Sequence, residues 1–384
     1  MGNREKRTTA FLAPFYAGVV IGGVVVSGLG YLIPVYLKLL GYGGSEIGLG
    51  GTLMAVPYIL ITFLLYPAYS KFRNTRVYSS SALLTSSAVL IILLNKSLPA
   101  IYLAQIILGA SLAIYYPVAE IIIAKLYPPN TRARIYGLFG ASWSIGYLVG
   151  PSLSGVLLDS AGIQTTLNVL FLLSLSSFLS LFFFKADIGM DNGDSERRIF
   201  RGLYLFLVAS LIFSGMTAII ISVLPGIAKG AGYGASFIGY SYSLFSFSRL
   251  VGFLLVSRAN IRPTLGGISL TALGSALPLS VMINVEKWIL LPAVLSFLGI
   301  LVSLFNSMTY LYMTNSLGGD PIYLISRYEF NIGIGFFITP IIAGVIADSY
   351  GAAAMIIFSM TLCIAAGLAV TSIGLLSRRS SSQS

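Results

Sequence analysis

Long apolar stretches recur along the whole chain, and short polar breaks separate them. A helix that spans a membrane needs about 20 predominantly apolar residues. Twelve stretches meet this requirement, at 11–37, 47–69, 77–94, 98–126, 135–158, 164–184, 203–227, 235–256, 265–283, 288–313, 322–346 and 352–376. They are continuously apolar and do not alternate with polar residues, which excludes a membrane β-barrel. The pattern therefore predicts an all-α polytopic membrane protein.

Composition supports this interpretation and removes several classes of function. Of the 384 residues, 57% are apolar and 9% are charged, whereas soluble proteins carry about 25% charged residues. Apolar stretches continue to the C-terminal region, so they are not a single signal peptide. The chain has no histidine and one cysteine, Cys363, which we expect to lie in an apolar environment. Disulfides, Cys/His metal sites and catalysis that needs histidine are excluded, and we expect no cofactor and no metal.

The formal net charge of +11 reflects an uneven distribution of basic residues between the loops. On one side most loops are basic, whereas the opposite loops carry only Lys38, Lys96, Lys229 and Lys287. By the positive-inside rule, both termini are expected to be cytoplasmic. The basic loops then face phospholipid head groups of the cytoplasmic membrane. Nucleic-acid binding is not expected, because no soluble domain is present to carry it.

The two halves of the chain repeat each other. Residues 34–48 (PVYLKLLGYGGSEIG) match residues 225–239 (PGIAKGAGYGASFIG), and residues 150–162 (GPSLSGVLLDSAG) match residues 339–351 (TPIIAGVIADSYG). Two collinear matches at nearly one spacing predict two related six-helix halves. We expect a tail at 1–10, a half at 11–184, a cytoplasmic linker at 185–201, a half at 202–376 and a tail at 377–384. Asp159 and Asp348 are expected to cap the helices that follow them.

One motif resembles the major facilitator superfamily of transporters. Gly137, Gly146, Gly150-Pro151 and Ser154-Gly155 follow the spacing of the G-x8-G-x3-GP-x2-GG signature, which is typical of its drug:proton antiporters, with Ser154 in place of one glycine. Small residues allow close helix packing, which is the alternative interpretation of the motif. The resemblance covers essentially the whole chain, and 127–137 resembles the family's turn between helices 4 and 5. It implies a monomeric carrier of a small-molecule substrate.

Two other motifs of that family are altered here. The loop between the second and third spans keeps basic residues, but Lys71 stands where the family has an aspartate. Gln105 stands where the drug antiporters carry an arginine ahead of Gly109. A proton mechanism that depends on that arginine therefore does not transfer to this chain.

Four charged residues lie well inside the predicted spans: Glu120, Arg249, Arg327 and Glu329. Each costs roughly 3 kcal/mol to insert, so ionisable residues in spans mark functional sites. Helical rise places all four at one level, about 8–10 Å below the cytoplasmic surface. Three interpretations remain open: an ion-pair gate between the halves, proton carriage by the carboxylates, and a static pair of Arg249 or Arg327 with Glu329.

Polar and aromatic residues near mid-span are candidates for a substrate cavity: Tyr31, Gln105, Tyr115, Tyr116, Asn306 and Asn331. Tyrosine offers a flat apolar face and one hydrogen-bonding end, which suits amphiphilic solutes. Ordinary packing is the alternative role for these residues, and for Tyr31 a place in the interfacial aromatic belt.

These observations favour a secondary transporter that works by alternating access, because the chain has no nucleotide-binding P-loop. Proton-coupled export of amphiphilic or drug-like compounds is the leading expectation, and uptake of a sugar, organic acid or amino acid is the alternative. A membrane enzyme is disfavoured because the acidic residues are scattered. A transporter-like receptor would need a partner surface, and the only long insert is 185–201.

Overall fold

The computed structural model describes residues 2–64, 76–126, 129–183, 202–258, 263–316 and 321–381. These residues are almost wholly helical. The helices are α1 (Gly2–Leu39), α2 (Gly44–Leu64), α4 (Arg76–Leu94), α5 (Leu98–Leu126), α6 (Pro129–Phe182), α7 (Gly202–Ser222), α8 (Leu224–Gly230), α9 (Ala235–Arg258), α10 (Leu265–Gly274), α11 (Ala276–Val281), the 3-10 helix η1 (Val285–Leu290), α12 (Leu291–Ser316) and α13 (Pro321–Ser381). The expected linker at 185–201 and Lys71 lie outside the described residues.

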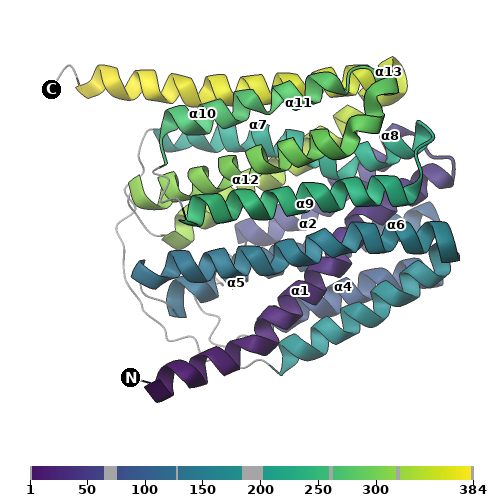
Figure 1. Ribbon diagram of the computed structural model, residues 1–384, viewed down its shortest axis with the longest axis horizontal. Helices are drawn as coiled ribbons and strands as arrows, with labels where there is room; N and C mark the ends of the chain where they lie inside the picture. The colour runs from purple at the N-terminus through teal and green to yellow at the C-terminus, as the bar shows by residue number, and fades with distance from the viewer. Residues whose placement is uncertain are drawn as a thin grey trace.

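The helices run side by side, and α1 begins at the same end of the bundle at which α13 finishes (Figure 1). We call this the termini end and the opposite one the far end. Within the described residues, seven helices are long and apolar enough to cross a membrane. Two of them, α6 and α13, are twice the usual length for a span, and each contains one glycine with non-helical backbone, Gly162 and Gly351. Each therefore comprises two helical segments that meet at a turn.

Two of the predicted spans are each interrupted in the structure, although the sequence predicts one continuous helix for each. The stretch 203–227 separates into α7 and α8, where Pro225 lies at the start of the second helix. Proline has no backbone N–H to continue the helical ladder, which explains a break at this position. The stretch 265–283 separates into α10 and α11 at Ser275.

The sequence repeats adopt matching backbone conformations. Within the described ranges, four glycines have positive φ angles: Gly41 at 89°, Gly162 at 76°, Gly232 at 95° and Gly351 at 84°. They form two pairs, Gly41 with Gly232 and Gly162 with Gly351, at the same positions of the two repeats. Positive φ favours glycine because it lacks a Cβ atom. The repeats thus encode the same turns in each half.

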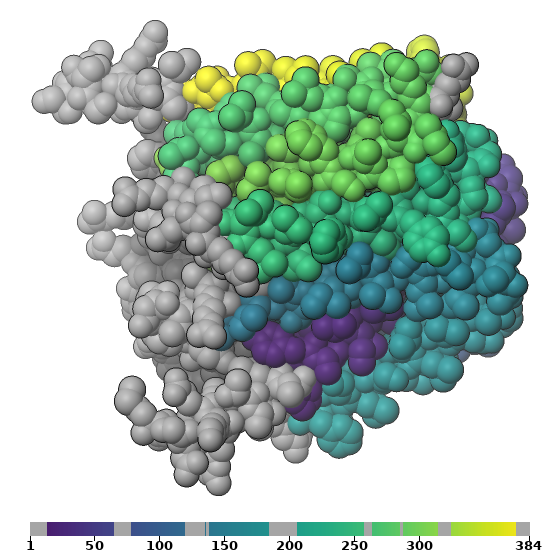
Figure 2. Space-filling model, in the orientation of Figure 1, coloured from purple at the N-terminus to yellow at the C-terminus, as the bar shows by residue number. Residues whose placement is uncertain are grey.

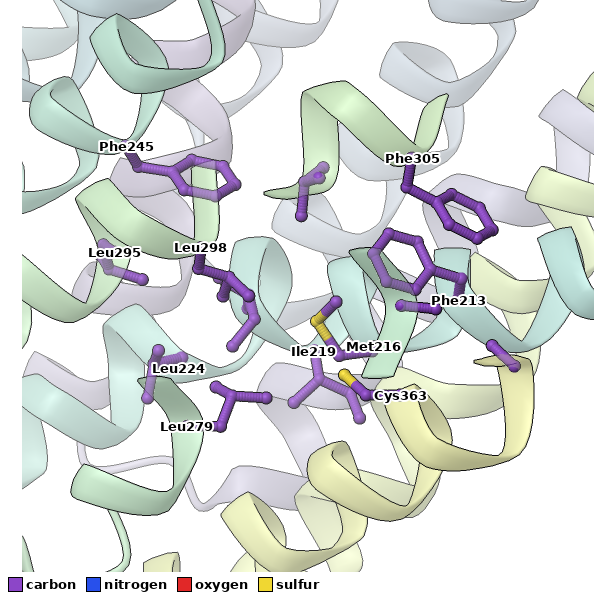
Figure 3. Packing of buried hydrophobic residues seen from close by; sticks show 14 of the residues in the cluster. Phe213, Met216, Ile219, Leu224, Phe245, Leu279, Leu295, Leu298, Phe305 and Cys363 are labelled. Atoms are coloured by element: carbon purple, nitrogen blue, oxygen red, sulfur yellow. The ribbon is translucent and has the colours of Figure 1, made fainter. Parts of the chain in front are cut away.

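In the view of Figure 2, residues before the expected linker (purple to teal) lie mainly in the lower part of the molecule, and those after it (teal-green to yellow) mainly in the upper part. Contacts between the halves are made chiefly by α2 with α13 and by α6 with α9. The largest apolar cluster belongs mainly to the second half (Figure 3). In it the rings of Phe213 and Phe305 stack with centroids 3.9 Å apart. Cys363 is buried in this cluster, as the sequence predicts.

Candidate functional site

A cavity of about 270 Å³ lies between the two halves. Its wall is mostly aromatic and aliphatic, with a few polar side chains, from α1, α2, α5 and α6 on one side and α7, α9, α12 and α13 on the other. Pockets that hold drug-sized ligands have volumes of about 300–1,000 Å³ and a similar mixture of many apolar and few polar groups. The volume of this cavity lies just below that range, and its lining suits a small amphiphilic solute.

Half of the predicted cavity residues lie on this wall. Tyr31, Tyr116 and Asn306 line the cavity, and the Tyr31 hydroxyl donates a hydrogen bond to the Ala235 carbonyl in the other half. Tyr31 is 2% exposed, which places it inside the bundle and not in an interfacial belt.

The other three predicted cavity residues are placed elsewhere. Gln105 is buried next to Gly50 of α2. Tyr115 is packed within the first half, where its hydroxyl donates to the Val19 carbonyl at 3.0 Å. Asn331 donates to the Arg327 carbonyl of its own helix at 2.7 Å. Spacing along a helix does not show which face points inward, and this explains the difference.

Sequence reasoning did not identify most of the aromatic wall. Tyr58, Trp143, Tyr147, Tyr242, Phe245 and Tyr328 all line the cavity. The hydroxyls of Tyr116 and Tyr147 are hydrogen-bonded at 2.8 Å. One signal was available in the sequence, because Trp143 and Tyr147 flank Gly146 of the glycine motif and follow a four-residue helical spacing.

Three of the four intramembrane charges contact aromatic residues of the opposite half. The Arg249 Cζ lies 4.8 Å from the ring centroid of Trp143. The Arg327 Cζ lies 5.7 Å from the ring centroid of Phe63. The Glu329 carboxylate accepts a hydrogen bond from the Tyr58 hydroxyl. Arg249 and Glu329 both line the cavity and are buried.

The predicted static ion pair of Arg249 with Glu329, both in the second half, is not formed in this structure. The Arg249 guanidinium contacts the rings of Trp143 and Phe245, and the Glu329 carboxylate accepts its hydrogen bond from Tyr58. Glu120 lies in α5, but its side chain is outside the described part of the chain. An ion pair that involves Glu120 stays a prediction.

The glycine motif of α6 brings helices together, as expected for small residues. A Cβ atom added at Gly146 would overlap the backbone of α1 at Val20, and one added at Gly150 would overlap Val24. At Gly155, an added Cβ would lie 2.6 Å from the Ala235 carbonyl oxygen of α9, in the other half. Pro151 lines the cavity. The surroundings of Gly137 are outside the described residues.

Two carboxylates connect the halves at the far end. Asp159 of α6 accepts hydrogen bonds from the Ser236 backbone N–H at 2.7 Å and the Ser236 hydroxyl at 2.6 Å, at the start of α9. Asp348 of α13 accepts hydrogen bonds from the backbone N–H groups of Gly44 at 2.6 Å and Ser45 at 2.7 Å, and from the Ser45 hydroxyl at 2.5 Å, at the start of α2. We call these the two latches.

The latches correct the capping prediction. Each aspartate caps a helix, but the helix belongs to the opposite half and is not the next one in sequence. The reason is that the end of one repeat packs against the beginning of the other. An added Cβ at Gly48 would overlap the Pro340 carbonyl, and one at Gly239 would lie 2.5 Å from the Pro151 carbonyl oxygen. The spacing that the two repeats share thus positions both latches at the far end.

The electrostatics of the latches favour the ionised carboxylates. Partial burial alone would raise the pKa of Asp348, but hydrogen bonds from the Ser45 hydroxyl and the Gly44 and Ser45 N–H groups outweigh it and hold this pKa below its ordinary value. The pKa of Asp159 is lowered in the same way, by the Ser236 hydroxyl and N–H against the effect of burial. A helix N-terminus carries a partial positive charge, which adds to the attraction.

Comparison with known proteins identifies the family. The model of the Major Facilitator Superfamily matches residues 15–322. The chain belongs to this superfamily. Members are transporters of small molecules, and the apolar helices make this chain a multi-pass membrane protein.

Curated relatives of this superfamily member match over short stretches. Quinolone resistance protein NorA of Staphylococcus aureus is 24% identical over 139 residues, which are 35% of this chain and 36% of NorA. A quinolone resistance transporter of Acinetobacter baumannii is 29% identical over 127 residues, which are 32% of this chain and 28% of that protein. The matched stretch spans about a third of each relative's length.

Solved structures share the fold over nearly the whole chain. A point mutant of the nucleoside transporter NupG superposes with a TM-score of 0.72 at 12% identity, covering 94% of this chain and 99% of that one. A bacterial homologue of the human lysosomal transporter Spinster, in an inward-facing and occupied conformation, superposes with a TM-score of 0.69 at 14% identity, covering 97% of each chain. At these identities the likeness establishes the fold alone.

Proposed function

We propose that the chain is a secondary transporter that exports amphiphilic, drug-like compounds across the cytoplasmic membrane in exchange for protons. The observation that carries this proposal is the cavity between the halves, whose wall is rich in aromatic residues and includes a buried carboxylate. The drug-efflux direction draws on the glycine motif of α6 and on the quinolone resistance relatives. The proposal includes twelve spans in two six-helix halves, cytoplasmic termini, a cytoplasmic linker and a monomeric protein.

The transport cycle we propose is a rocking of the two halves about the cavity. Its far-end-closed state is held by the two latches, and its opening breaks the hydrogen bonds of both at once. Because the latches occupy equivalent positions in the repeats, the two halves separate symmetrically at this end. The predicted gate of intramembrane charges, which includes Glu120 and Arg327, would close the cavity toward the termini end.

Among the residues that the structure describes, Glu329 is the proposed proton carrier. Its carboxylate lies on the cavity wall and contacts Tyr58 of the other half. When the halves separate, this contact is lost and the hydration of the carboxylate changes. A carboxylate whose environment alternates between burial and water changes its proton affinity, which is what coupling requires. Glu120 is the second candidate carrier.

The experiment is gradient-driven transport in proteoliposomes. Purified protein is reconstituted with an acidic lumen, and accumulation of radiolabelled norfloxacin is compared with that in protein-free liposomes at the same gradient. Protein-dependent accumulation is expected to disappear in Glu329→Gln, whereas exchange of norfloxacin without a gradient persists. Undiminished gradient-driven accumulation in both Glu329→Gln and Glu120→Gln would remove these carboxylates as carriers. Absence of any flux with wild-type protein would overturn the export proposal.

A further inference from the structure

Arg249 places a positive charge on the cavity wall with no acidic partner in the described part of the chain. It lies on α9, lines the cavity and is 9% exposed. Its Nε is buried and has no hydrogen-bond partner among the residues that the structure describes. The buried carboxylate of the same cavity, Glu329, instead accepts its hydrogen bond from Tyr58. A buried guanidinium therefore faces a space that can hold a ligand.

The neighbours of Arg249 stabilise its charge but leave hydrogen bonding incomplete. The Cζ lies 4.8 Å from the ring centroid of Trp143 and 5.6 Å from that of Phe245. Aromatic faces attract a cation through the ring quadrupole. They do not accept hydrogen bonds in the plane of the guanidinium, and it is in this plane that its N–H groups point. A group with two in-plane acceptor oxygens is what the site lacks.

We propose that Arg249 binds the carboxylate of the transported solute, so that this cavity selects aromatic carboxylic acids and zwitterions over neutral or purely cationic analogues. The inference rests on the proposed transport function and names its substrate class. A guanidinium and a carboxylate form paired, charge-assisted hydrogen bonds in a fixed geometry. The aromatic body of such a solute would pack against the rings of Trp143, Tyr116 and Tyr147, which lie on the same wall.

Binding measurements on the purified full-length chain test this assignment. Isothermal titration calorimetry compares norfloxacin, which carries an aromatic carboxylate, with norfloxacin methyl ester, which differs only at that group. Wild-type protein is expected to bind the acid roughly 10–100-fold more tightly than the ester, which is the range expected for a hydrogen bond to a charged group. In Arg249→Gln the two affinities should come within about threefold of each other, with the ester affinity little changed.

Two further variants test whether the preference for the acid depends on the geometry of the Arg249 guanidinium and on its position in the cavity. Arg249→Lys keeps the charge but not the paired geometry, so an intermediate preference is expected. Lys96→Gln removes one cation at a loop away from the cavity, and the wild-type preference is expected to persist. Thermal unfolding checks the fold of Arg249→Gln, which loses a desolvated charge and should unfold no lower than wild type.

Specific outcomes would overturn the assignment. Equal affinity of wild-type protein for acid and ester would do so without any variant, and so would a full preference for the acid in folded Arg249→Gln. Flux of norfloxacin in proteoliposomes is measured separately. Flux without an acid preference overturns the role of Arg249 alone, whereas an acid preference without flux overturns the transport proposal alone.

Discussion

Weakening a latch should increase how often the cavity opens toward the far end. At Asp348, three donors converge on one carboxylate, from Gly44 and Ser45 of the other half. Hydrogen bonds to a charged group contribute about 1.5–3 kcal/mol each when protected from water. Because this carboxylate is largely exposed, solvent screening reduces that value. Asp348→Asn retains one acceptor oxygen and loses the charge, so we expect a loss of about 1–2 kcal/mol.

This energy converts directly into a change in populations. A tenfold change in an equilibrium constant corresponds to about 1.4 kcal/mol, so Asp348→Asn should raise the far-end-open fraction roughly 5–30-fold. Asp159→Asn, at the equivalent position of the other repeat, should have a similar effect. Both latches break in one opening motion, so the double variant should lose about 2–4 kcal/mol, which is roughly 30–900-fold.

The assay measures how fast a cavity cysteine reacts from the far side. Ser246→Cys, in a Cys363→Ala background, places a thiol on the cavity wall. The rate of labelling by a membrane-impermeant methanethiosulfonate is proportional to the open fraction when opening and closing are fast. Ser160→Ala is the matched control, because the Ser160 hydroxyl donates to Val156 of its own helix. Far-side rates within about twofold of wild type in both single variants and the double variant would refute the latch.

Three further results are expected. The pKa values of the two latch carboxylates are lowered in the closed state, so their stabilisation of that state is complete above the ordinary Asp pKa of about 3.9 and is lost as the pH falls through the lowered values. The distance between spin labels at Leu40→Cys and Tyr350→Cys should therefore lengthen below about pH 4. A distance unaffected by acid would contradict this. Gly239→Ala adds a Cβ near the Pro151 carbonyl, and such overpacking destabilises a packed interface by about 1–3 kcal/mol. It should therefore raise the rate at which Ser246→Cys is labelled from the far side. Gly266→Ala, which has open space around it, should leave this rate unchanged. Tyr58→Phe removes the donor to Glu329 and should shift the pH dependence of transport, measured as initial norfloxacin flux against pH; an unchanged profile would separate Tyr58 from coupling.

Much of the fold can be predicted from the sequence, because the need to span a membrane imposes strong hydrophobic patterns on the chain. Apolar length predicts helices, and the repeats 34–48 and 225–239 predict equivalent structures whose glycines share positive φ angles. The breaks at Val223 and Ser275 were not predicted, because short interruptions within a span leave its average hydropathy unchanged.

The site was predicted less completely, because it depends on contacts between segments far apart in sequence. Burial of a charge in a span is visible in the sequence, so Arg249 and Glu329 were identified. Their partners Trp143 and Tyr58 were not, since each belongs to the other half. The latch aspartates were recognised as caps, but the helix that each one caps is determined by the packing of one repeat on the other.

The central claim is that transport requires the far end to open. Ser45→Cys with Asp348→Cys, in the Cys363→Ala background, places two thiols where a hydroxyl and a carboxylate now lie 2.5 Å apart across the halves. In proteoliposomes, oxidation to a disulfide is expected to reduce norfloxacin flux to that of protein-free liposomes. Reduction should restore the flux, and each single-cysteine variant should be insensitive to oxidation. Full flux through the disulfide-linked protein would contradict the account.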